Sequence, residues 1–164
     1  MSACGTCRLF DAKMNDKMTI QIIPIAADQK SQWLPLWRGY QSFYKVDIPE
    51  IISDVTWHRL LDPAEPMGAA LAWHGGKAVG LVHHIQHRSC WTVGDYCYLQ
   101  DLFVAEDARG TGTGRKLIEY VYEFAKAKGC SRVHWLTQET NTDAMILYDK
   151  VADRSGFIQY RKLF

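Results

Sequence analysis

The turn from Arg109 to Arg115 constrains this chain more than any other stretch of the sequence. Three glycines, Gly110, Gly112 and Gly114, alternate with other residues between a predicted strand, Tyr96 to Ala105, and a predicted helix that continues to Lys128. Glycines remove side chains where a backbone must curl, and a helix start presents unpaired N–H groups at its positive end. The sequence therefore predicts an anion-binding turn, and a pyrophosphate is its natural ligand.

The spacing of these residues excludes two common phosphate-binding loops. A P-loop has a second glycine five positions after the first, but that position is Arg115, and Lys116 is followed by Leu117 rather than Ser or Thr. A dinucleotide-binding fingerprint also requires its third glycine where Arg115 stands. The alternative that remains is a turn whose glycines only make a tight connection between strand and helix.

The rest of the chain predicts a mixed α/β fold around one sheet. The other predicted strands are Thr19 to Ile25, Met67 to Trp73, Ala78 to His87, Val133 to Thr137 and a closing strand, Phe157 to Lys162. The predicted helices run from an N-cap at Asp28 towards Lys45, then after Pro49, from Gly110 to Lys128, and from Thr142 to Val151. We expect Pro35 to kink or delay the first helix. We expect the second helix to bury Ile51, Ile52, Val55 and Leu60.

Composition narrows the class of protein. A chain of 164 residues predicts one domain, here residues 19–164, after an N-terminal tail of residues 1–18. A net charge of +1 and the lack of a long apolar run favour neither a nucleic-acid partner nor a membrane. Without a recognisable signal peptide, we expect a cytoplasmic protein with reduced thiols. Cys4 and Cys7 have C-x-x-C spacing but no second ligand pair, so we expect no metal site.

Two motifs resemble the GNAT superfamily of N-acetyltransferases: Arg109-x-x-Gly112-x-Gly114, and Asn141-x-x-Ala144-x-x-x-Tyr148 downstream. The stretches 98–104 and 147–152 resemble, more narrowly, the branch that holds polyamine, yeast histone and D-amino-acid acetyltransferases. The resemblance implies a GNAT-like fold with a mostly antiparallel sheet of about six to seven strands and about four flanking helices. It also implies acetyl-CoA as co-substrate and a homodimer joined through the C-terminal strand.

The resemblance also implies roles for individual residues. Backbone groups of Leu102, Phe103 and Val104 would pair with the pantetheine arm, Asn141 and Ala144 would lie beside it, and Lys150 would lie near the nucleotide. The pyrophosphate would be held by Arg109, Gly110, Thr111, Gly112, Thr113, Gly114 and Arg115. Tyr148 would donate a proton to the departing thiolate, although a tyrosine on an apolar helix face can also be a core residue.

The general base is the least determined part of the site. Many relatives in the polyamine branch carry a glutamate where this chain has Gln100, and an amide cannot accept a proton as a base. Asp101 can take the proton through water or anchor a cationic amine, or it can be a structural strand residue. Neighbours on an ideal strand face opposite sides, but the resemblance implies a β-bulge, which this family's strand usually has and which could bring both residues near the site.

The leading hypothesis is an enzyme that moves an acetyl group from acetyl-CoA to a primary amine by direct attack in a ternary complex. The acceptor would be a polyamine, an amino acid, or a lysine of a basic peptide such as a histone tail. The alternative is a non-catalytic acyl-CoA-binding sensor or regulatory subunit. The histidines of one strand, His83, His84 and His87, are expected to be satisfied or solvated rather than metal ligands. The aromatic residues Trp37, Tyr40, Tyr44 and Trp91 could wall a substrate cleft, although aromatic stripes are more often core.

Overall fold

The computed structural model describes residues 19–164, and these residues form one five-stranded sheet in the order β1-β2-β3-β4-β5. Neighbouring strands are antiparallel from β1 to β4, whereas β5 runs parallel to β4. The strands are β1 (Gln21–Pro24), β2 (Met67–His74), β3 (Lys77–His87), β4 (Tyr96–Val104) and β5 (Arg132–His134). The mixed α/β, mostly antiparallel architecture is as predicted.

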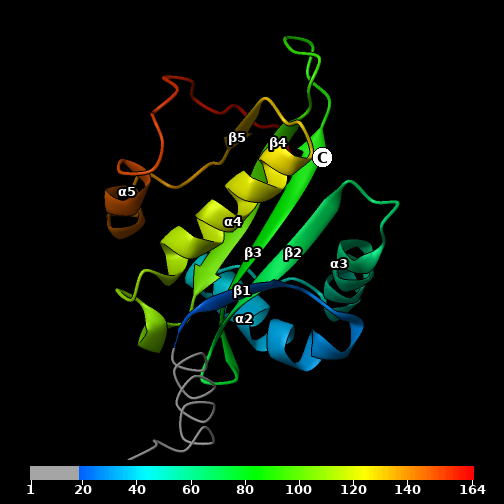
Figure 1. Ribbon diagram of the computed structural model, residues 1–164, viewed down its shortest axis with the longest axis vertical. Coiled ribbons are helices and arrows are strands. Elements are labelled where there is room, and N and C mark those ends of the chain that lie inside the picture. The colour runs from blue at the N-terminus through cyan, green and yellow to red at the C-terminus, as the bar shows by residue number, and fades with distance from the viewer. Residues whose placement is uncertain (1–18) are drawn as a thin grey trace, which may run out of the picture.

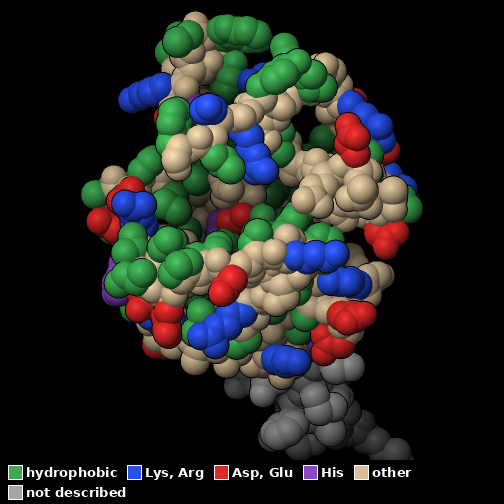
Figure 2. Space-filling view, turned by 180° about the vertical axis from the view of Figure 1, so that it is seen from behind, with side chains coloured by type: hydrophobic (Ala, Val, Ile, Leu, Met, Phe, Trp, Pro, Cys, Tyr) green, Lys and Arg blue, Asp and Glu red, His purple; other side chains and the backbone are tan. Residues whose placement is uncertain are grey.

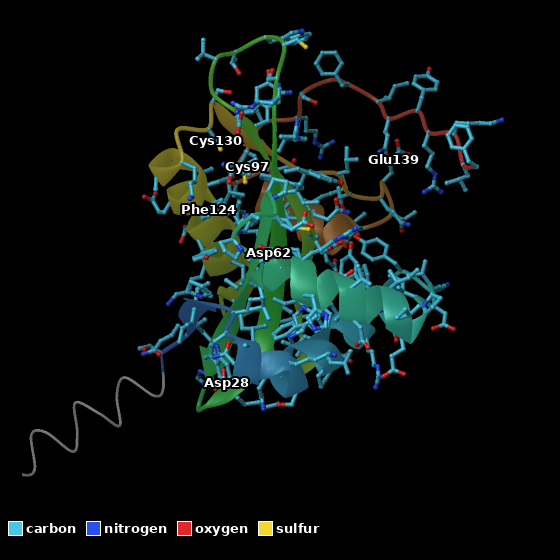
Figure 3. All side chains as sticks on the ribbon, turned by 90° about the vertical axis from the view of Figure 1, so that its right-hand side faces the viewer. Asp28, Asp62, Cys97, Phe124, Cys130 and Glu139 are labelled. Carbon is cyan, nitrogen blue, oxygen red and sulfur yellow. The ribbon has the colours of Figure 1, made fainter. Side chains whose placement is uncertain are left out.

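Helices cover both faces of the sheet. Figure 3, seen edge-on, shows α4 on one side and α2 and α3 on the other, and Figure 1 shows α5 apart from them beside the start of α4. The α-helices are α2 (Lys30–Phe43), α3 (Glu50–Leu61), α4 (Thr113–Ala127) and α5 (Thr142–Tyr148), and two 3-10 turns are η1 (Ala27–Gln29) and η2 (Glu106–Ala108).

Alternation along the central strands divides the core into two layers. Leu71 and Leu81 point towards α2 and α3, where they pack with Trp33 and Trp57. Their strand neighbours point the other way and pack with the apolar face of α4. That second layer includes Ala70, Ala72, Val82, Leu117, Ile118 and Val121.

Two glycines determine the turn of the hairpin between β2 and β3. Gly75 and Gly76 both adopt positive φ, the conformation that a tight turn requires and that glycine adopts without a steric cost. The pair therefore sets the register that joins His74 to Lys77.

The first two helices differ in detail from their predictions. Asp28 lies inside η1 rather than capping the helix, and α2 begins at Lys30, so Pro35 is accommodated within it and does not delay its start. In α3 the apolar residues Ile51, Ile52 and Val55 are exposed, so that prediction was wrong. The buried face of α3 is instead formed by Ser53, Trp57 and Leu60, since α3 packs on β2 and the Trp37 indole of α2 donates to the Ser53 hydroxyl at 3.1 Å.

The predicted closing strand from Phe157 to Lys162 is also absent, since residues 152–164 form no strand. The sheet of the described region therefore has five strands rather than six or seven. The C-terminal segment, red in Figure 1, extends beyond α5 outside the sheet. Its apolar side chains Phe157, Ile158, Tyr160, Leu163 and Phe164 are all at least 74% exposed, because no strand edge of this copy pairs with the segment.

None of the helices within residues 19–164 is both long and apolar enough to cross a membrane. The tail of residues 1–18, with Cys4 and Cys7, lies outside the described residues.

Candidate active site

The parallel strands β4 and β5 separate partway along their length. They pair only from Tyr96 to Tyr98, and beyond Tyr98 the remainder of β4 has strand partners on β3 alone within the described residues. The outer edge of residues 99–104 therefore presents backbone groups without a strand neighbour. Such an edge can pair with an extended ligand as an added strand would. It contains Leu102, Phe103 and Val104, which the resemblance assigned to the pantetheine arm.

The glycine turn at the start of α4 opens its amides. Gly110 has φ +75° and Gly112 has φ +83°, and a Cβ built on either would meet no atom within 4 Å. The first amide of α4 to donate to the chain is Lys116, which bonds the Gly112 carbonyl at 3.1 Å. In the described part of the chain, the N–H groups from Gly110 to Arg115 have no protein acceptor.

This row of unpaired donors fits an anion. The helix dipole of the 15-residue α4 adds partial positive charge at the same end. Two side chains stabilise the turn from within: the Thr111 hydroxyl donates to the Ala108 carbonyl at 2.7 Å and lies 2.7 Å from the Thr113 hydroxyl. The hydroxyls thus hold the turn while leaving its amides open, so a pyrophosphate fits these residues.

The two arginines of the turn lie at the surface. Arg109 donates from Nε to the Val104 carbonyl at 3.2 Å, which ties the turn to the end of β4. Arg115 lies 3.9 Å from Glu119, a weak pair on the first turns of α4. Both guanidinium groups are exposed or half-buried, so they can add charge beside the amides.

Helix α5 packs against this turn and carries Tyr148. A Cβ on Gly114 would meet Leu147 Cδ2 at 3.3 Å, so the glycine lets α5 approach the start of α4 closely. Tyr148 is half-buried and packs edge-on against Trp135, with ring centroids 5.4 Å apart. Burial, and then the nearby Tyr44, raise the pKa of Tyr148 to about 12. The phenol is therefore a proton donor throughout the neutral range.

The remaining predicted residues of α5 lie near its ends. Asn141 is the residue before the helix, and its amide donates to the Thr137 hydroxyl at 3.2 Å. Ala144 lies half-buried within α5, while Lys150 follows the helix and is exposed.

A β-bulge lies on β4 at Gln100, as the resemblance implied. His83 pairs with Asp101 and the next residue, His84, pairs with Leu99, so Gln100 is the extra residue. The bulge shifts the alternation by one position. Leu99 belongs to the core under α4, whereas Asp101 contacts His83 on the α2 side. The Gln100 side chain is exposed.

Asp101 is held in a buried polar network. Its Oδ2 lies 2.9 Å from His83 Nδ1, and His83 Nε2 accepts a hydrogen bond from Trp33 Nε1 at 2.8 Å. His83 is 2% exposed and Asp101 is 8% exposed. The phenol of Tyr40 lies near enough for the charge of Asp101 to raise its pKa. Three elements, α2, β3 and β4, thus meet at one carboxylate.

Three tyrosines lie near this carboxylate. Burial, and then the charge of Asp101, raise the pKa of Tyr40 far above its ordinary value. Burial and the charge of Asp101 also raise the pKa values of Tyr44 and Tyr98. Tyr44 also raises the pKa of Tyr148. Tyr44 therefore lies near both Asp101 and the phenol of Tyr148.

The side of the site that carries Asp101 and the tyrosines is formed where α2 approaches β4 closely. A Cβ on Gly39 would lie 2.8 Å from the Phe103 ring, so only glycine lets α2 rest there without a shift. Figure 2, which views the face behind that of Figure 1, shows a hollow lined by hydrophobic side chains with acidic and histidine atoms at its floor.

The structure separates the histidines of β3. His83 is satisfied by two partners, as expected, whereas His84 packs on the Phe124 ring on the α4 side of the sheet. His87 lies at the strand end, 3.2 Å from His134. Residues 19–164 contain no group of three or more His, Cys, Asp or Glu that could hold a metal ion.

The cysteines of the described region are free thiols. Cys97 and Cys130 lie near each other by the end of α4 (Figure 3), and burial raises the pKa of Cys97 to about 12. A thiol with so high a pKa is a poor nucleophile, so Cys97 does not support covalent catalysis.

The sequence did not predict two features of this site. Tyr98 entered the sequence analysis only as the first residue of the stretch 98–104, and Trp33 was assigned no role. Their roles depend on the bulge at Gln100 and on a contact 50 positions apart in sequence, between Trp33 and His83. Trp91, which was considered as a cleft wall, is 76% exposed.

Comparison with known proteins identifies relatives of this arrangement. Residues 33–152 match the model of the acetyltransferase (GNAT) family. The D-amino-acid N-acetyltransferase HPA3 of Saccharomyces cerevisiae is 36% identical over 151 residues, covering 91% of this chain and 92% of the yeast protein. The thialysine N-epsilon-acetyltransferase of Bos taurus is 33% identical over 110 residues, covering 67% of this chain and 55% of that protein.

Solved structures share the fold. A ribosomal-protein-alanine N-acetyltransferase from Brucella melitensis superposes with a TM-score of 0.75 at 20% identity, covering 89% of this chain and all of that one. An aminoglycoside N-acetyltransferase in complex with CoA superposes with a TM-score of 0.75 at 19% identity, covering 88% of this chain and 95% of that one.

Proposed function

Because the chain belongs to the GNAT acetyltransferase family, we propose that it transfers an acetyl group from acetyl-CoA to a primary amine at the site between β4 and α5. One observation carries this assignment: the open amides of Gly110 to Arg115 lie next to an unpaired β4 edge and beside the helix of Tyr148. A diphosphate on the amides and an extended arm along the edge would bring a thioester towards the phenol. The further binding residues are those of the resemblance: Asn141 and Ala144 beside the arm, and Lys150 near the nucleotide.

The reaction requires a neutral amine, a site for the oxyanion and a proton for the leaving sulfur. An alkylammonium has a reference pKa of about 10.4, so deprotonating it at pH 7 costs about 4–5 kcal/mol. In our proposal Asp101 receives this proton, directly or through water, and the backbone N–H near Phe103 stabilises the oxyanion. As the C–N bond forms and the C–S bond breaks, Tyr148 protonates the thiolate, and the second proton that the nitrogen loses restores the phenol.

Gln100 has a lesser role in this proposal. It is exposed at the bulge, and an amide can orient the acceptor or a water molecule but cannot accept its proton. The bulge itself matters more, since it places Asp101 on the side of the sheet that carries Tyr40.

The acceptor is a small primary amine or a basic peptide. Two acceptors follow from the names of the relatives: the amine of a D-amino acid and the side-chain amine of a lysine analogue. A panel of D- and L-amino acids, thialysine, polyamines and a histone-tail peptide, assayed by thiol release from acetyl-CoA, tests the proposal. Acetyl-dependent thiol release with at least one amine is expected, and none with any amine would contradict it.

A non-catalytic acyl-CoA sensor would need the same amides but neither Tyr148 nor Asp101. The buried network at Asp101 favours the enzyme, because binding acetyl-CoA alone gives no reason to hold a carboxylate there. Calorimetry that showed tight acetyl-CoA binding with no transfer would favour the sensor.

We also propose a cytoplasmic homodimer. The apolar side chains of the C-terminal segment, from Phe157 to Phe164, are exposed in one copy, and apolar surface of this kind is typical of an interface. Light scattering tests the assembly: the full chain should have twice the monomer mass, and deletion of residues 157–164 should give monomers. Cell fractionation tests the location.

A further inference from the structure

The contacts of His83 determine which of its ring nitrogens carries a proton. The indole of Trp33 is only a donor, so His83 Nε2 must accept through its lone pair at 2.8 Å. An imidazolium would place an N–H against the indole N–H at that distance. His83 is therefore neutral in this arrangement, and its one proton lies on Nδ1, where it is donated to Asp101 Oδ2 at 2.9 Å.

This tautomer leaves the charge of Asp101 uncompensated. The donor to its carboxylate is the neutral imidazole of His83, and the nearby Tyr40 is a neutral phenol. Within residues 19–164, Asp101 forms no ion pair with a lysine or arginine, although it is only 8% exposed. Buried charges in proteins are normally paired, so this one indicates a cationic ligand.

The surroundings of the carboxylate also suit a cation. Tyr40 lies 4.9 Å from Tyr44 between ring centroids, and Tyr44 and Tyr98 both respond to the charge of Asp101. Aromatic faces attract ammonium groups, and phenol oxygens can accept their protons in hydrogen bonds. All three tyrosines are half-buried, so the cluster is open to solvent on one side.

We propose that Trp33 and His83 are positioning residues that fix Asp101 as an oriented, uncompensated carboxylate, so that the acceptor amine enters as its ammonium ion and pairs with Asp101. This inference rests on the proposed function and specifies how the acceptor is recognised. Trp33 and His83 touch neither substrate; they act through Asp101. A protonated histidine would neutralise the same carboxylate and remove the attraction for the amine.

Two substitutions at one position separate the bonds of His83. His83→Asn places an amide N–H near the Nδ1 position, so it retains the donor to Asp101 and loses the acceptor for Trp33. His83→Gln reaches the Nε2 position, so it retains an acceptor for Trp33 and loses the donor to Asp101. Trp33→Phe keeps an aromatic ring but removes the indole donor, which frees His83 to adopt either tautomer.

The chain of hydrogen bonds from Trp33 through His83 to Asp101, here called the relay, predicts different kinetics for these variants. For His83→Gln we expect the KM for the amine to rise about tenfold, because one charge-assisted hydrogen bond orients the carboxylate. For His83→Asn we expect a KM for the amine within about threefold of the parent, even where urea unfolding shows lower stability. Trp33→Phe should lie between them, and the KM for acetyl-CoA should stay unchanged in all three, since none touches the amide turn.

Nitrogen NMR of the unmodified protein provides an independent measurement. Long-range ¹⁵N–¹H correlation should show His83 at neutral pH with a proton on Nδ1 and none on Nε2. A proton on Nε2, or equal amine KM values for the Asn and Gln variants, would overturn the relay. A parent enzyme that acetylates no amine would contradict the proposed function instead. The NMR measurement of the His83 tautomer would still test the relay in that case.

Discussion

Replacing Gly112 with alanine tests the amide turn in isolation from side-chain chemistry. Gly112 has φ +83°, and a Cβ there would meet no atom within 4 Å, so the substitution adds backbone strain and no clash. Gly76 in the β2–β3 hairpin is a matched control, with φ +82° and the same open surroundings. A left-handed conformation costs an L-residue about 1–2 kcal/mol, so both variants should lose that much unfolding free energy.

Binding of acetyl-CoA should distinguish the two variants. Relief of strain at position 112 would rotate the neighbouring peptide planes, which carry the open amides of Gly110 to Arg115. A hydrogen bond to a charged group contributes about 1.5–3 kcal/mol, so misdirecting one amide should weaken acetyl-CoA binding at least about tenfold. The turn at Gly76 contributes no such amide to the site, and its variant should bind acetyl-CoA like the parent.

Urea unfolding and calorimetric titration with acetyl-CoA measure these two quantities separately. Equal losses of stability with a selective loss of affinity in Gly112→Ala would support the reasoning. If both variants bound acetyl-CoA with the parent's affinity, the turn would be only a connection between strand and helix. The proposal that its amides bind the pyrophosphate would then be refuted.

Three further predictions concern the catalytic groups and the core. Tyr148→Phe should lower kcat about 100-fold with little change in the KM for acetyl-CoA. Because the pKa of Tyr148 is raised to about 12, ionisation of this phenol should cause no loss of activity in the parent near pH 10. Gln100→Glu should lower the KM for a cationic amine severalfold, because a second carboxylate at the bulge adds attraction for an ammonium group; an unchanged KM would show that the bulge residue does not reach the acceptor. Burial lowers the pKa of His84 to about 4, so its neutral form is favoured by folding and stability should fall by about 3 kcal/mol as the pH drops from about 6.5 to 4. His84→Gln should reduce this pH dependence of urea unfolding, and an unaltered slope would assign it to other groups.

The sequence predicted the parts of this protein that depend on local pattern. The glycine hairpin, the long strand β4 and the amphipathic helix α4 follow from turn chemistry and periodicity, with boundaries within a few residues. The bulge at Gln100 was expected from family resemblance alone, since nothing in the residues 98–104 requires an extra position.

Predictions failed where packing between distant elements decides the outcome. Ile51, Ile52 and Val55 are apolar, but α3 buries Ser53 and Trp57 instead, through contacts with Trp37 and Trp33 of α2. The segment from Phe157 has the composition of a strand, but a strand forms only where another edge pairs with it.

The polar network at Asp101 lay beyond sequence reasoning for the same reason. His83 and His84 are neighbours of one type, yet one joins a carboxylate and the other packs on Phe124. Only the register of β3 with β4 and the approach of α2 through Gly39 determine which histidine meets Asp101.

A crystal structure of the protein with bound acetyl-CoA tests the central claim most directly. We predict diphosphate oxygens within hydrogen-bonding distance of the amides from Gly110 to Arg115, and the Tyr148 hydroxyl within reach of the sulfur. A cofactor bound elsewhere with these amides still facing solvent, or a Tyr148 side chain directed away from the thioester, would contradict the account.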